Sequence, residues 1–211
     1  MTLYTGLVGA SALAGLGYCA LIERAPSAGR TLVKAVAVGA LAVLAYFRGA
    51  PIALVLGLGL SCLGDAFLAG DAKKWLPSGL AAFLAAHVAY IWLFLQDGGG
   101  RAALAAEPAR ALGVIGAAAA GLAMIAWLWR ALGPLRPAVV VYAAALAAMV
   151  ATAFTLPKVL WPAMVGALCF MASDALLSAE LFKQIRSRLT AQAVWWLYYA
   201  AQASIAFAYL R

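Results

Sequence analysis

The feature that most constrains this chain is a series of eight apolar runs, each about as long as a membrane-crossing helix. A bilayer core of ~30 Å requires ~20 apolar helical residues per crossing. Hydrophobic residues make up 67% of the 211 residues and charged residues only 10%, too few to cover a soluble domain. The sequence therefore predicts an all-α polytopic membrane bundle of eight transmembrane helices. The runs cover roughly residues 3–22, 31–47, 51–69, 77–95, 111–129, 136–155, 160–180 and 190–210.

The connections between these runs are short, so residues 1–211 are expected to form a single integral membrane domain. The longest connection, Gln96–Arg110, is Gly-rich and then Ala-rich, which predicts a loop with a short interfacial turn. No Lys or Arg precedes the first run and no small-residue cleavage site follows it, so we expect a retained helix. Cys19, Cys62 and Cys169 lie within runs, at no disulfide-like or zinc-like spacing, and are expected to be small packing residues.

The basic residues predict the orientation of the chain. The net charge of +8 is spread over short loops, where it anchors and orients a membrane protein, so no nucleic-acid partner is expected. Nine Lys and Arg lie on the loops of one face and five on the other; the nine are Arg24, Arg30, Lys73, Lys74, Arg130, Arg136, Lys183, Arg186 and Arg188. The positive-inside rule then places both termini outside the cytoplasm, in a bacterial inner membrane.

Polar side chains inside the runs gather in one half of the expected membrane. At ~1.5 Å per residue, Asp65 and Asp174 lie ~7 to 9 Å inside the cytoplasmic boundary, and Lys34 is close to the same boundary. The further polar residues of this half are Tyr142, Tyr199, His87 and Gln202. Ionisable residues within a membrane are functional by default. The alternative is a structural ion pair between Lys34 and either Asp65 or Asp174.

The two acidic segments resemble each other. "GDAFLAG" (64–70) and "SDALLSA" (173–179) share a small residue, Asp, Ala, a large residue, Leu and a small residue. They lie four runs apart, which favours a parallel repeat of two four-helix halves with both Asp facing one central pocket. Ser61 lies four residues before Asp65 on the same helical face, and His87 and Tyr90 are three apart, as are Tyr199 and Gln202.

Successive motifs along the chain resemble those of the YhhN-like family, which includes the vertebrate transmembrane lysoplasmalogenases. The motifs are "GLGLSCLGDAFL", "SGLAAFLAAHVAY", "RPAVVVYAAALAAM", "GALCFMASDALLSAELF" and "LYYAAQASIA". The most specific parts are Gly64–Asp65 and Ser173–Asp174; Lys34 also matches, although the proline expected after it is missing. The resemblance implies hydrolysis of the vinyl ether bond of a lysoplasmalogen to a fatty aldehyde and glycerophosphocholine or glycerophosphoethanolamine.

Aspartate chemistry suits this reaction. Vinyl ether cleavage begins with protonation of the outer alkene carbon, and two carboxyl groups in a dry site share a proton because both cannot easily ionise. One of Asp65 and Asp174 would then donate the proton while the other stabilises the cation and activates water. Lys34 would decide which Asp stays ionised, or bind the substrate phosphate. Ser61, His87, Tyr142, Ser173, Tyr199 and Gln202 are the candidates for binding or orienting the substrate.

The sequence also limits cofactors and raises one rival function. A three-His zinc site cannot be built from His87 alone, so neither a required metal nor another cofactor is expected. The expected partners are a lysophospholipid substrate and the bilayer. The alternative is a small proton- or solute-coupled transporter that uses the buried Asp and Lys. All eight prolines fall in loops or at the ends of runs, so no broken helix marks a transport site.

Overall fold

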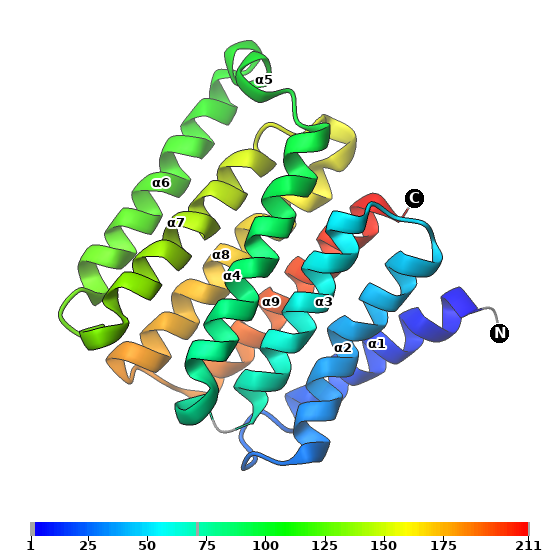
Figure 1. Ribbon diagram of the computed structural model, residues 1–211, viewed down its shortest axis with the longest axis vertical. Helices are drawn as coiled ribbons and strands as arrows, with labels where there is room; N and C mark the ends of the chain where they lie inside the picture. The colour runs from blue at the N-terminus through cyan, green and yellow to red at the C-terminus, as the bar shows by residue number, and fades with distance from the viewer. Residues whose placement is uncertain (1–2, 71, 211) are drawn as a thin grey trace. The chain divides into compact units, whose positions relative to one another are not determined.

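The computed structural model of the protein describes residues 3–70 and 72–210, and every regular element within them is helical (Figure 1). This confirms the all-α class. The α-helices are α1 (Leu3–Cys19), α2 (Ala28–Phe47), α3 (Ile52–Ala69), α4 (Ala72–Asp97), α5 (Gly100–Ala106), α6 (Pro108–Leu128), α7 (Arg136–Ala153), α8 (Trp161–Lys183) and α9 (Arg188–Tyr209), with short 3₁₀ turns η1 (Gly133–Leu135) and η2 (Lys158–Leu160).

The chain forms two compact units, which are described separately. The first comprises Met1–Ala89 with Tyr209–Arg211. In it, α1 packs against α2, and α2 against α3, as the blue and cyan helices of Figure 1 show. A glycine lets α4 approach α3 closely, because a Cβ added at Gly64 would lie only 2.6 Å from the ring of Phe83. Small residues at such crossings are the usual way to pack helices tightly in a membrane.

The second unit is Tyr90–Ala208. Here α6 lies beside α7, and α7 beside α8 (Figure 1). The contact between α8 and α9 again depends on glycine, since a Cβ at Gly166 would come within 2.8 Å of the carbonyl oxygen of Ala201. A backbone atom cannot move aside as a side chain can, so this crossing needs Gly166.

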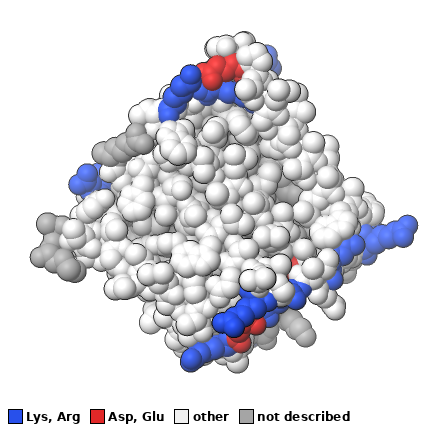
Figure 2. Space-filling model, turned by 180° about the vertical axis from the view of Figure 1, so that it is seen from behind, with Lys and Arg blue, Asp and Glu red and all other residues white. Residues whose placement is uncertain are grey.

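Six helices among the described residues are long and apolar enough to cross a membrane, as in a multi-pass membrane protein. They are α2, α3, α4 from residue 74, α6, α7 from residue 133 and α8 from residue 158. The predicted count of eight crossings includes two more helices: α1 is shorter, with 17 residues, and α9 is richer in polar residues. Eight crossings and the repeat of two halves therefore stay predictions. Figure 2 shows a broad uncharged surface, with Lys and Arg in a few groups.

Some boundaries differ from the sequence prediction. The run expected at 77–95 is a helix from Ala72 to Asp97, so Pro77 lies inside α4 rather than at its start. Pro77 is the sixth residue of α4, so the hydrogen bond that it removes lies close to the N-terminal end of the helix. The long connection contains the seven-residue helix α5. The three cysteines are half-buried and form no disulfide.

Candidate functional site

Lys34 and Asp65 form a buried ion pair in the first unit. Lys34 is on α2, nearly two turns past a helix start that Ser27 caps by accepting a hydrogen bond from the backbone N–H of Arg30. Asp65 is on α3, and its side chain is 0% exposed. The ammonium Nζ of Lys34 lies 3.0 Å from Oδ1 of Asp65. Of the two pairings that the sequence allowed for Lys34, this structure has the one with Asp65.

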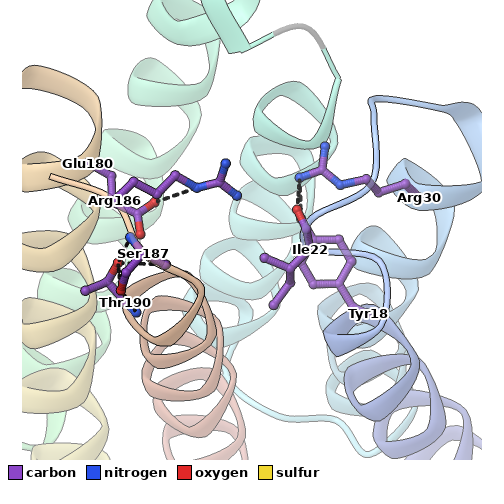
Figure 3. A network of polar contacts seen from close by, with 7 residues as sticks. All are labelled: Tyr18, Ile22, Arg30, Glu180, Arg186, Ser187 and Thr190. Carbon is purple, nitrogen blue, oxygen red and sulfur yellow. Dashed lines mark hydrogen bonds and ion pairs between the residues drawn. The ribbon is translucent and has the colours of Figure 1, made fainter. Parts of the chain in front are cut away.

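Tyr18 and Arg30 surround this pair, and the sequence prediction missed both as site residues. The Nζ of Lys34 lies 5.6 Å from the centroid of the Tyr18 ring, a cation–π distance. Arg30 donates hydrogen bonds to the Tyr18 hydroxyl at 3.2 Å and to the carbonyl oxygen of Ile22 at 3.5 Å (Figure 3). It also donates to the carbonyl oxygen of Ala69 at 3.0 Å. Arg30 therefore ties the ends of α1 and α3 to α2.

A signal for Tyr18 was present in the sequence. Tyr18 lies four residues before the end of the run 3–22 and Lys34 three residues into the run 31–47, so a residue count would have placed both near the same boundary. Treating Arg30 only as a loop charge hid its role, because a charge count does not reveal which carbonyl groups a guanidinium will reach.

Asp174 has a different kind of partner in the second unit. The Tyr142 hydroxyl, on α7, donates a hydrogen bond of 2.6 Å to Oδ2 of Asp174 on α8. Asp174 is 8% exposed, and the next residue toward the N-terminus, Ser173, donates to the backbone carbonyl of Val194 at 2.9 Å. The Ser173 hydroxyl thus fixes α8 against α9 beside the acid.

Gln202, on α9, is fully buried. Its Oε1 accepts a hydrogen bond of 2.5 Å from the hydroxyl of Tyr90. Among the described residues, no hydrogen-bond acceptor is in range of its Nε2. The expectation that a polar group at this depth needs an internal partner is thus met on the oxygen side, and the amide nitrogen can donate to another molecule.

The remaining predicted residues fall into the same two units. Ser61 and His87 are both 0% exposed in the first unit. Tyr199, in the second, is half-buried and stacks on Trp195 with ring centroids 5.9 Å apart. The described part of the chain contains no group of three His, Cys, Asp or Glu side chains placed to hold a metal ion. Each unit therefore contributes one buried acid with a proton-bearing partner.

Comparison with known proteins gives the family. The family model described as "YhhN family" matches residues 29–209. A protein named "Lysoplasmalogenase" from Mycobacterium bovis is 38% identical over 156 residues, which cover 71% of this chain and 57% of that protein. A protein of the same name from Mycobacterium tuberculosis matches equally.

The match spans little more than half the length of these curated relatives. No solved structure matches the chain. The family match covers most of the sequence, including both motifs with a buried aspartate. The chain belongs to the YhhN family.

Proposed function

We propose that this protein hydrolyses the vinyl ether bond of lysoplasmalogens, releasing a fatty aldehyde and glycerophosphocholine or glycerophosphoethanolamine. The names of the two mycobacterial relatives support the substrate class. The structural observation that carries the proposal is that each motif aspartate is buried and contacts a proton-bearing group: Lys34 at 3.0 Å from Asp65 and Tyr142 at 2.6 Å from Asp174.

The reaction requires a strong acid and then a water molecule. Protonation of the outer alkene carbon forms an oxocarbenium ion. Water adds to this ion and loses a proton, which gives a hemiacetal, and the hemiacetal collapses to the aldehyde and the glycerol hydroxyl. A carboxylic acid and a carboxylate together serve both steps, as in glycoside hydrolysis, which also passes through an oxocarbenium-like transition state.

The contacts favour Asp174 as the acid and Asp65 as the carboxylate. Tyr142 donates to Oδ2 of Asp174, so a transferable proton on this acid would sit on Oδ1. Asp65 has the ammonium of Lys34 beside it, which stabilises a negative charge there. Asp65 then stabilises the oxocarbenium ion and accepts the proton of the attacking water.

The other residues bind or orient. The Nε2 of Gln202 donates to the ether oxygen or to the water, and Tyr90 holds the amide in place. Ser61 and His87 contribute polar groups in the first unit, Ser173 holds α8 against α9, and Tyr199 stacks on Trp195 within α9. The whole chain acts as one membrane domain without a cofactor, and its substrate enters from the bilayer.

The expected orientation places both termini outside the cytoplasm of a bacterial inner membrane. The test replaces Cys19, Cys62 and Cys169 and introduces one cysteine, either at exposed Ser187 or at exposed Arg101. A membrane-impermeant thiol reagent applied outside the cell should label Arg101→Cys and not Ser187→Cys. The reverse pattern would invert the proposed topology.

The decisive experiment compares two lipids with purified protein in detergent. Lysoplasmalogen should yield aldehyde, and an alkyl-ether lysolipid of equal chain length should yield none, because it has no alkene to protonate. Asp65→Asn and Asp174→Asn should each abolish turnover, whereas Asp97→Asn, at an exposed position on α4, should retain it. Absence of aldehyde with the wild-type chain would contradict the hydrolase and favour the transporter.

Exhaustive chelation tests the metal-free mechanism. The rate should be unchanged after dialysis against a chelator, since the proposed steps use only carboxyl groups and water. Loss of activity that one divalent cation restores would require a different mechanism.

A further inference from the structure

An open pocket of about 550 Å³ lies at the C-terminal end of α6 in the second unit. It is lined by Leu122, Ile125, Ala126, Trp127, Trp129, Arg130 and Lys183. Five of these side chains are apolar and two are cationic. No acidic residue of the described chain lines it. The pocket therefore combines an apolar wall with a positive end.

The apolar wall faces outward. Leu122 is 68% exposed and Trp127 45%, on a helix long and apolar enough to span a bilayer, and Trp129, directly after this helix, is 46% exposed. Exposed leucine on such a helix contacts lipid chains, and tryptophans near its end typically lie at the level of the headgroups. From Leu122 to Arg130 is eight residues, or ~12 Å along a helix. The pocket thus extends from the headgroup level toward the acyl chains.

Aromatic rings hold the basic side chains at its end. The Nζ of Lys183, on α8, lies 5.3 Å from the ring centroid of Trp127. Arg136 lies 4.4 Å from the ring of Trp129 and also donates to the Trp129 carbonyl at 3.2 Å. These contacts hold Lys183 and Arg136 against tryptophans that line the pocket, and neither contact neutralises a positive charge.

The acidic residue of α8 nearest in sequence to Lys183 is paired with a residue outside the pocket. Glu180, three residues before Lys183, lies 3.8 Å from Arg186 (Figure 3). Glu180 does not line the pocket, and Arg186 lies in the loop where Ser187 and Thr190 form the local cap of α9. The pocket keeps a net positive charge.

We propose that this pocket binds an anionic phospholipid, with its phosphate between Arg130 and Lys183 and one acyl chain against Leu122 and Ile125. Basic pockets among membrane helices bind anionic headgroups, and a guanidinium matches the geometry of phosphate oxygens. The proposal does not depend on the reaction, because none of these residues belongs to the proposed catalytic set.

The test measures lipid binding to the intact protein in detergent by native mass spectrometry. Phosphatidylglycerol is titrated against phosphatidylcholine with the same acyl chains. The double variant R130Q/K183Q removes both cations, while R101Q/K158Q removes two exposed cations elsewhere as the matched control. The variant R130K/K183R keeps both charges.

Phosphatidylglycerol should bind the wild-type protein at least several-fold more tightly than phosphatidylcholine. R130Q/K183Q should weaken the binding of phosphatidylglycerol about tenfold, since each basic residue contributes near an anionic surface. In the matched control and in R130K/K183R, the affinity for phosphatidylglycerol should stay within about twofold of the wild type. Equal binding of the two lipids, an equal loss in the matched control, or no loss in R130Q/K183Q would overturn the proposal. Displacement of the lipid by millimolar inorganic phosphate would identify a free-anion site instead.

Discussion

The ammonium of Lys34 lies 3.0 Å from a carboxylate oxygen of Asp65 whose side chain is wholly buried, and Tyr18 and Arg30 enclose this pair. Removing two charges from water costs several kcal/mol per ion, so a buried pair is not by itself a source of stability. Its retention inside an apolar helix pair agrees with the role in catalysis proposed for Asp65. Stability and turnover can therefore be separated by mutation.

Lys34→Met should destabilise the protein by about 3 to 5 kcal/mol, because it leaves the Asp65 carboxylate buried without its cation. Lys34→Met/Asp65→Asn should recover much of that stability and have no turnover. Stability is measured by unfolding in detergent, and turnover by the release of aldehyde. If the single Lys34 variant is as stable as the wild type, the ion pair is not important for the fold.

Tyr142→Phe should lower turnover by about tenfold to a hundredfold, because it removes the 2.6 Å hydrogen bond that stabilises the Asp174 carboxylate formed when the acid gives up its proton. Hydrogen bonds to charged groups are worth about 1.5 to 3 kcal/mol. Tyr90→Phe is the matched control, since it deletes a similarly short bond, to Gln202. Tyr90→Phe should lower turnover less than Tyr142→Phe does. Equal losses of turnover in the two variants would mean that the bond to the acid has no special role.

Tyr18→Leu should reduce turnover several-fold by removing the ring that faces Lys34, while Tyr18→Phe should keep most of it, because the ring is retained and only the hydroxyl that accepts from Arg30 is lost. Turnover of each variant is compared with its unfolding temperature. A larger loss of turnover in Tyr18→Phe than in Tyr18→Leu would show that the hydrogen bond from Arg30, rather than the ring, positions Lys34.

Gly166→Ala should markedly destabilise the packing of α8 on α9, because the new methyl group would lie 2.8 Å from the Ala201 carbonyl oxygen. Gly116→Ala, on α6, is the control, since nothing lies within 4 Å of a Cβ there. It should be neutral or slightly stabilising, as alanine is the better helix former. Folded yield after detergent extraction distinguishes the two, and equal yields would contradict the close approach.

The approximate positions of the apolar helices and the identities of the buried acids could be read directly from the sequence. Helix length and apolar character are local properties of the chain, and the bilayer sets the length that matters. The expectation that Asp65, Asp174 and Lys34 lie at a similar depth also comes from counting residues along each run. The start of α4 was placed too late, because Pro77 suggested a boundary where the helix continues.

Only the tertiary structure decided which side chains meet. The sequence allowed Lys34 to pair with either acid, and it gave Tyr142 and Gln202 no particular partner. These pairings depend on the rotation of each helix about its axis and on its neighbours. Both are set by packing at close crossings such as Gly64 on Phe83 and by bonds such as that of Ser173 to α9. Such contacts join residues far apart in the chain, which no local periodicity specifies.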